Sequence, residues 1–205
     1  MPRRAAAVAD GGDLREHLLV ATERLLAAGP PQTLTTRAIA RAAGVSDGVL
    51  YNYFADREDL LLAALVRRFA GLVERFHAAL PEPGTRPLEE SLRAVAEAAL
   101  ELHVDAAPIV AGLVAEPALL RRFMIEIHRE PLGGPQLVGP VAAYLDAERG
   151  AGRVAAVDTA AAADLLVGAI VMRAFTTLLG VPRDELAERL PALVDVLVRG
   201  LAPRP

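Results

Sequence analysis

Side chains suited to binding nucleic acid gather in one short stretch of the chain, between residues 35 and 53. Hydroxyl groups bind phosphate oxygens, and Asn, Arg and Asp side chains can pair with the edges of adenine, guanine and cytosine. The stretch carries Thr35, Thr36, Arg37, Ser46, Asp47, Gly48, Tyr51, Asn52 and Tyr53. This combination predicts contacts to double-stranded DNA.

Each of these residue types has an expected role. Thr35 and Thr36 stand at the start of a predicted helix, where hydroxyls and free backbone N–H groups suit a phosphate, and Ser46 has the same place before the next helix. Gly48 lets the backbone approach DNA closely. We expect the Tyr51 hydroxyl, like that of Tyr53, to reach a phosphate while its ring packs.

Three further side chains are candidates for reading bases, namely Arg37, Asp47 and Asn52. Asp47 has two interpretations. It could accept a hydrogen bond from cytosine, or its negative charge could repel phosphates and mark a weak binder.

The segment that positions these side chains, residues 35–60, predicts a helix, a tight turn, a second helix and the start of a third. The first helix has an apolar face at helical spacing, formed by Ala38, Ile39, Ala42 and Ala43. Gly44 suits a left-handed turn, and Ser46 is expected to cap the second helix, from Asp47 to about Asn52. A short helix held out by a turn has the geometry that enters a major groove. An ordinary helical corner is the alternative, and with either interpretation we expect Tyr51 and Phe54 to lie partly in the core.

This segment resembles the DNA-binding head of the TetR family of transcriptional regulators. The matching residues are Thr36, Ile39, Ala40, Ala43, Gly44, Val45, Ser46, Gly48, Leu50, Tyr51, Phe54 and Leu60. A tract near the carboxyl end, AAADLLVGAIVMRAFTTLLG, resembles the family more weakly. The family usually has a phosphate-binding Lys at the position of Arg57, so the resemblance implies that Arg57 contacts phosphate. Asp47 and Tyr53 depart from the family, where a basic or neutral residue and His are commoner.

The resemblance implies a ligand-responsive regulator, usually a repressor, that binds a palindromic operator as a homodimer and is released by a small molecule. Composition alone does not suggest DNA binding, because the 205 residues carry a net charge of −4. Residues 1–80 hold ten Arg against nine acids, whereas residues 81–205 hold twelve against seventeen. Arg3 and Arg4 could reach DNA, or could belong to a solvated tail.

The composition also limits the chemistry. No cysteine is present, so disulfides, thiolate metal sites and cysteine nucleophiles are excluded. The four histidines are scattered and match no metal-binding motif, and we expect neither a metal nor another cofactor. No Ser-His-Asp order or phosphate-binding glycine loop appears, and we expect no enzyme. A helical-bundle enzyme or small-molecule-binding protein without a DNA-binding role is the alternative.

Periodic apolar residues predict an all-α fold of nine or ten helices, with a helix-turn-helix DNA-binding head and a larger ligand-binding and dimerisation domain. The head spans residues 1–55, a long helix over 56–80 connects it, and the second domain spans 81–205. Asp56 and Asp59 are expected to cap the connecting helix. We also expect a separate helix over 107–115 and a break over 131–140.

The most apolar helix, over 157–179, is expected to be buried on nearly every side. Its apolar run, interrupted by Arg173, is shorter than the ~20 residues of a membrane span. With no secretory signal at the start, we expect a cytoplasmic protein. The last two helices are expected to pair with their copies in a dimer, because one chain cannot bury their apolar faces.

A ligand cavity is expected among the helices of the second domain. Its candidate lining is His103, Phe123, Met124, Ile127, His128, Tyr144, Met172 and Phe175. Ligand cavities in proteins are mostly apolar with a few polar groups, and this candidate lining has the same composition. We therefore expect a largely apolar effector. Each of these residues could instead be plain core, and His103 in particular could be a satisfied interior histidine.

Overall fold

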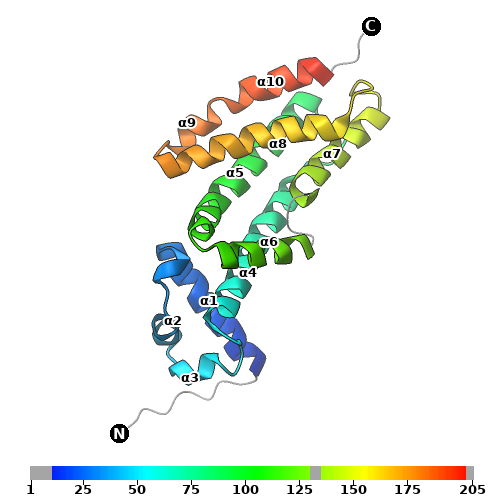
Figure 1. Ribbon diagram of the computed structural model, residues 1–205. Helices are drawn as coiled ribbons and strands as arrows, with labels where there is room; N and C mark the ends of the chain where they lie inside the picture. Colours follow the sequence, from blue (N-terminus) through cyan, green and yellow to red (C-terminus); the bar gives the residue numbers. More distant parts are fainter. Residues whose placement is uncertain (1–10, 130–134, 202–205) are drawn as a thin grey trace. The chain divides into compact units, whose positions relative to one another are not determined.

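The computed structural model describes residues 11–129 and 135–201, and within them the chain is helical without any strand (Figure 1). The all-α prediction is therefore confirmed. Arg3 and Arg4 lie outside the described residues. The α-helices are α1 (Gly11–Ala28), α2 (Thr36–Ala43), α3 (Asp47–Leu50), α4 (Arg57–Ala79), α5 (Leu88–Val114), α6 (Pro117–Arg129), α7 (Pro135–Gly150), α8 (Thr159–Phe175), α9 (Arg183–Ala187) and α10 (Leu190–Leu201), with short 3-10 helices η1 (Pro31–Thr33) and η2 (Thr176–Leu179).

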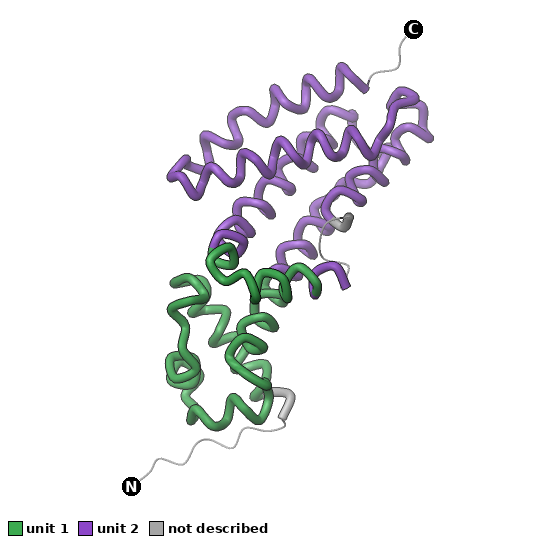
Figure 2. The backbone as a smooth tube through the Cα atoms, in the orientation of Figure 1, with its two compact units in different colours: residues 1–68, 112–125 green, residues 69–111, 126–205 purple. Residues whose placement is uncertain are grey.

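The chain divides into two compact units, which Figure 2 shows in different colours. Unit 1 consists of Met1–Arg68 and Gly112–Ile125, and unit 2 of Phe69–Ala111 and Glu126–Pro205. Unit 1 thus contains the predicted head and, in addition, the first half of α4, the end of α5 and most of α6. The domain limits given above, at residues 55 and 80, stay a prediction.

Unit 1 is built around α1, α2 and α3, with α1 packed on α2 and α2 on α3. Ion pairs of Arg67 with Glu16 and Glu23 join α4 to α1, and ion pairs of Arg122 with Glu58 and Asp59 join α6 to α4. The buried side chains include Leu18, Ile39, Leu50, Phe54, Leu60, Leu113, Leu119 and Phe123. Burying a side chain of this size contributes about 1.5–3 kcal/mol, so a few of them suffice to fix these short helices.

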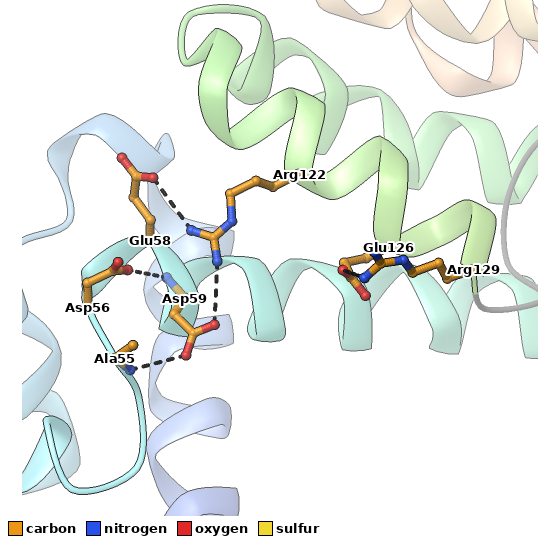
Figure 3. A network of polar contacts seen from close by, with 7 residues as sticks. All are labelled: Ala55, Asp56, Glu58, Asp59, Arg122, Glu126 and Arg129. Atoms are coloured by element: carbon orange, nitrogen blue, oxygen red, sulfur yellow. Dashed lines mark hydrogen bonds and ion pairs between the residues drawn. The ribbon is translucent and has the colours of Figure 1, made fainter.

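The start of α4 is capped as the sequence predicted (Figure 3). The Asp56 carboxylate accepts a hydrogen bond from the Asp59 amide at 2.7 Å, and the Asp59 carboxylate accepts one from the Ala55 amide at 3.2 Å. These reciprocal bonds satisfy N–H groups that have no partner inside the helix. They fix the residue at which the connecting helix begins.

Unit 2 packs α7 and α10 against α8 around a core of Leu, Val and Ala side chains. Within it, the buried Glu148 joins three segments. Its carboxylate accepts hydrogen bonds from the Tyr144 hydroxyl at 2.5 Å and the Gly84 amide at 3.2 Å, and it forms an ion pair with Arg153. Burial alone would raise the pKa of Glu148, but the hydrogen bonds from Tyr144, Arg153 and Gly84 lower it. Burial, together with the bond to Glu148, raises the pKa of Tyr144 to about 12.

Two expected helix boundaries are wrong. The segment 107–115 is not a separate helix, because α5 continues to Val114 with Pro108 inside it. Pro108 is exposed and its neighbours Ala107 and Ile109 are buried, so apolar burial outweighs the missing hydrogen bond. The break over 131–140 is also shorter than expected, since α7 begins at Pro135. A proline suits the first turn of a helix, where its missing N–H is not needed.

The expectation that α8 is buried on nearly every side is wrong for the single chain. Leu165 and Met172 are each 71% exposed, and Gly168 between them is exposed as well. By length and composition alone the segment Thr159–Leu179 could cross a membrane, and a third of it is buried inside this chain. The exposed residues recur at three and four positions, so they form one apolar stripe that the neighbouring α7 and α10 do not cover.

Candidate nucleic-acid interface

The turn between α2 and α3 has the geometry that the sequence predicted. Thr35 caps α2, its hydroxyl accepting a hydrogen bond from the Ala38 amide at 3.1 Å. Gly44 ends α2 in the left-handed conformation, with φ of 68°, which a residue with a side chain rarely adopts. Val45 then donates its amide to the Ala40 carbonyl at 3.0 Å. These bonds fix the direction in which α3 leaves the turn.

One side of α3 anchors the helix and the other faces solvent. Leu50 and Phe54 are 2% and 4% exposed and hold α3 on the core of unit 1. The exposed residues are Ser46, Asp47, Gly48, Tyr51 and Asn52. All five belong to the predicted DNA-binding set. The structure therefore brings these candidates together on one polar surface.

Two members of this surface depart from their expected local roles. Ser46 stands at the position before α3 but its side chain makes no capping hydrogen bond, so the predicted capping role is wrong. Tyr51 is 57% exposed rather than partly in the core. Both hydroxyls are thus presented to solvent instead of serving the fold, which suits the predicted contacts to phosphate.

Gly48 has no packing role that requires a glycine. A Cβ added there would meet no heavy atom within 4 Å, and φ is not in the left-handed region. Its backbone is exposed on the same surface. The fold therefore leaves this position open to a close approach from outside the chain.

The predicted contacts on α2 and after α3 are also accessible. Arg37 is exposed and Thr36 and Tyr53 are half-buried. Phe54 lies under the guanidinium group of Arg15, 5.1 Å from the ring centre, which ties α1 to the end of the α3 turn. Between residues 35 and 53 there are two arginines and one acid, Asp47, so this surface is weakly positive.

Arg57, to which the resemblance gave a contact to phosphate, makes hydrogen bonds within unit 1. Its Nε donates to the Leu34 carbonyl at 2.5 Å, and its Nη2 donates to the Pro31 carbonyl. The Glu116 carboxylate lies 3.6 Å from the same Nη2, and 27% of the side chain is exposed. Arg57 is therefore bound to the protein itself. Its contact to phosphate stays a prediction.

The eight candidate ligand-pocket residues are dispersed. Phe123, Ile127 and Tyr144 are buried, whereas Met124, His128, Met172 and Phe175 are exposed. The half-buried His103 has its Nδ1 2.7 Å from the Ala99 carbonyl, and burial lowers its pKa although that hydrogen bond opposes the shift. His103 thus fits the alternative interpretation, an interior histidine whose ring nitrogen already has a hydrogen-bond partner. That an effector uses any of the eight stays a prediction.

Sequence analysis missed a small cavity of about 40 Å³ between α4 and α5 in unit 2. Its lining includes Leu72, Phe76, Leu102 and the ion-paired Arg75 and Asp105, whose atoms lie 3.6 Å apart. The sequence signal that could have indicated this cavity was Arg75, a charged residue beside the apolar stripe of the connecting helix. Among residues 11–129 and 135–201, no three His, Cys, Asp or Glu side chains come together as metal ligands would.

The chain is similar to known proteins both in this segment and in its whole fold. Residues 18–64 match the family "Bacterial regulatory proteins, tetR family". The transcriptional repressor KstR of Rhodococcus jostii (strain RHA1) is 37% identical over 75 residues, which are 37% of this chain and 34% of that protein. The match therefore spans about a third of the repressor's length.

Two solved structures share the overall fold. One, from Mesorhizobium loti MAFF303099, is assigned to the TetR family and matches with a TM-score of 0.74 and 16% identity, over 95% of this chain and all of that one. The regulator FadR of Bacillus subtilis in complex with stearoyl-CoA matches with a TM-score of 0.62 and 19% identity, over 91% and 98%. At these identities the likeness is one of fold.

Fold and site together define a helix-turn-helix protein of the regulator class. The match over residues 18–64 covers α2, the turn and α3 with their anchoring residues. Residues 18–64 carry the segment shared by the TetR family of bacterial regulatory proteins, as the sequence indicated. The family and the relatives named here are transcriptional regulators, not enzymes.

Proposed function

We propose that this protein is a ligand-responsive transcriptional repressor that binds a palindromic operator in double-stranded DNA as a homodimer in the cytoplasm. The observation that carries the proposal is the polar surface of α3, which is exposed although Leu50 and Phe54 anchor the helix firmly. A short polar helix held rigidly outward has little value for packing and suits a major groove.

On this surface the contacts divide by chemistry. The hydroxyls of Thr35, Thr36, Ser46, Tyr51 and Tyr53 would bind phosphate and fix the register of the head on DNA. Arg37, Asp47 and Asn52 would reach base edges. Gly48 would let the α3 backbone lie close to the groove floor. The weak positive charge of the surface leaves much of the affinity to hydrogen bonds.

Dimerisation is supported by the apolar stripe of α8 and the adjoining face of α10. Leu165, Met172 and Leu179 are exposed along α8 and η2, and Val196 is 72% exposed on α10. Large apolar side chains in such a row indicate an interaction surface. In a twofold dimer the same surface of each chain packs against that of the other. Two heads would then read half-sites ~34–36 Å apart, or a multiple of that distance.

Control by a small molecule and action as a repressor are supported by the relatives. KstR is a repressor, and FadR of Bacillus subtilis was solved with stearoyl-CoA. We propose a small, largely apolar effector that binds in the larger helical domain and favours a state with low DNA affinity. A coupling of ~1–3 kcal/mol would change DNA affinity roughly 5- to 150-fold.

A mobility-shift titration on the DNA flanking the protein's own gene tests the proposal. Binding should be strongest at 50 mM salt and weaken towards 200 mM, because the counterions released by Arg near the phosphates contribute less at higher salt. Adding a long-chain acyl-CoA, with free coenzyme A as the control, should release the DNA if the effector is recognised by a long apolar acyl chain. Absence of any binding at 50 mM salt would favour a helical small-molecule-binding protein without a DNA-binding role. The exposed Asp47 would then be the mark of a surface that repels phosphate.

A further inference from the structure

Arg57 occupies a junction inside unit 1 where the chain enters α2. Its guanidinium group donates to two backbone carbonyls, of Pro31 and Leu34, through different nitrogens. Residues 31–34 form η1 and its end, and they stand directly before Thr35, the residue that caps α2. Arg57 therefore ties the first residue of α4 to the segment from which the DNA-contacting helix α2 begins.

The same segment is held from a second side by the end of α5. The side-chain amide of Gln32 donates to the Gly112 carbonyl at 2.9 Å. A Cβ on Gly112 would come within 2.8 Å of the Pro31 ring, closer than real contacts allow. Glu116, just after α5, places its carboxylate 3.6 Å from Arg57 and balances the charge of the guanidinium group. Residues 31–34 are thus held from two sides, with Pro31 and Leu34 buried and Gln32 and Thr33 exposed.

This geometry fits bidentate bonding by Arg and no other basic side chain. A planar guanidinium group donates in two directions at fixed spacing, whereas the ammonium group of Lys is a single point charge on a flexible stem. A single contact to phosphate would need only the charge, whereas a bidentate contact would need the same fork. The Nε and Nη2 edge of the fork already donates to two internal carbonyls, so this edge is not free for a bidentate contact to phosphate.

We propose that Arg57 is a positioning residue for DNA binding, which acts by fixing residues 31–34, and through them the start of α2, rather than by contacting phosphate. The proposal rests on the proposed function, because DNA affinity is one of its readouts. It assigns to Glu116 the role of counter-ion for this residue. The phosphate contacts of the head then come from the hydroxyls at residues 35–53.

Two substitutions separate the alternatives when DNA affinity is measured as a function of salt. Arg57→Lys keeps the charge without the fork, and Arg57→Gln removes both. A matched control, Arg24→Gln, removes the same charge from an exposed position on α1 of the same unit. All measurements are made at a temperature where circular dichroism shows each variant to be fully folded.

If Arg57 positions α2, both substitutions weaken DNA binding roughly 5- to 10-fold at every salt concentration, the effect of losing one or two hydrogen bonds. The slope of log affinity against log salt stays at the wild-type value, and Arg24→Gln leaves the affinity unchanged. The proposal is overturned if Arg57→Lys binds as the wild type does while Arg57→Gln reduces the slope by about 0.9, since that is the signature of one phosphate contact. It is overturned equally if both variants, once folded, bind with wild-type affinity.

Hydrogen exchange of the free protein supplies a readout that does not depend on DNA. The Ala38 amide is bonded to the Thr35 hydroxyl and the Ile39 amide to the Thr35 carbonyl, so both report on the start of α2. Both should exchange faster in Arg57→Lys, whereas the Ala161 amide, bonded to the capping Asp158 of α8, should not change. Unchanged exchange at Ala38 and Ile39 contradicts the positioning role. If the wild type binds no DNA, the proposed function fails and this exchange result alone decides whether Arg57 positions α2.

Discussion

At the scale of single residues, neighbouring aromatic side chains after α3 have opposite environments. Tyr51 is 57% exposed and Phe54 is 4% exposed, although three positions separate them and both match the family pattern. A pattern match cannot tell which of the two serves the fold and which serves DNA. The structure assigns Phe54 to the core of unit 1 and leaves the Tyr51 hydroxyl accessible.

This difference predicts opposite effects of two equivalent truncations. Tyr51→Ala should weaken DNA binding roughly 5- to 10-fold through a lost hydrogen bond to phosphate, and change the free energy of unfolding by less than about 0.5 kcal/mol. Phe54→Ala should destabilise the fold by about 3–5 kcal/mol, because it leaves a cavity in the core. Urea unfolding and anisotropy titrations measure both. A Tyr51→Ala variant as unstable as Phe54→Ala would place Tyr51 in the core and contradict the exposed site.

Much of the site was accessible to prediction at this scale, and the exceptions have physical causes. The left-handed Gly44 and the cap by Thr35 follow from residue type and local sequence, so both were predicted. The bonds of Arg57 depend on Pro31, Leu34 and Glu116, which are 23 to 59 positions away in the sequence. The spacing of residues within one segment carries no information about such distant contacts. The resemblance to the family indicated only that a positive charge is needed at position 57.

At the scale of helices, most elements follow from apolar periodicity and caps, and the errors occur at prolines. Pro108 was expected near the start of a separate helix and Pro140 in a break, yet both lie inside longer helices. A proline removes one hydrogen bond, but whether tertiary burial compensates cannot be read from local sequence. The last two helices were expected to have apolar faces that one chain cannot bury, but the residues of the exposed stripe of α8 could not be named, because a uniformly apolar helix does not indicate which side its neighbours cover.

The contact between α5 and η1 predicts that a normally favourable substitution is harmful. Gly112→Ala should gain about 1 kcal/mol of helix propensity, but the clash with the Pro31 ring should cost about 1–3 kcal/mol. The variant should therefore be less stable than the wild type in urea unfolding. Gly71→Ala in α4 is the matched control, since its Cβ meets nothing closer than 4.0 Å, and it should be stabilising. Equal stabilisation by both changes would show that η1 does not pack closely on α5.

The polar cluster that joins α7 to its neighbouring loops predicts a pH dependence. The pKa of Glu148 is lowered in the folded protein from an ordinary value of 4.5, so its ionised form favours folding. This contribution is complete above pH 4.5 and is lost as the pH falls through the lower, folded value. Glu148→Gln should cost about 2–3 kcal/mol at pH 7, because it leaves Arg153, only 31% exposed, without its partner.

Thermal unfolding of both proteins between pH 3 and pH 7 measures this effect. The difference in stability between wild type and Glu148→Gln should shrink as the pH falls below 4.5, since the wild-type carboxyl becomes neutral as well. Asp195→Asn is a suitable control, as it removes an acid from an exposed ion pair with Arg199 on α10. A difference that stays constant over this range would mean that the charge of Glu148 is not what stabilises the cluster.

At the scale of the whole molecule, the account requires two chains. A single head offers few basic groups for binding DNA. The exposed stripe of α8 consists of large apolar side chains at helical spacing, as is typical of an interface between proteins. Two linked heads also gain affinity, because binding of the first raises the effective concentration of the second.

Breaking this stripe should therefore abolish tight DNA binding without touching the head. Leu165→Glu should convert a dimer into a monomer in analytical ultracentrifugation and weaken operator binding by at least roughly 100-fold. Val114→Glu introduces the same charge at another exposed apolar position, 63% exposed near the end of α5, and should leave the dimer intact. A Leu165→Glu protein that remains dimeric would place the subunit interface elsewhere.

The central claim, that this helix-turn-helix protein reads a two-part operator, is tested most directly by hydroxyl-radical footprinting. The DNA flanking its own gene is titrated with the full chain at 50 mM salt, where phosphate contacts are strong. The account predicts two protected patches related by symmetry, with centres ~34–36 Å apart or a multiple of that distance. Uniform protection of unrelated sequences, or no protection at this salt concentration, would contradict it.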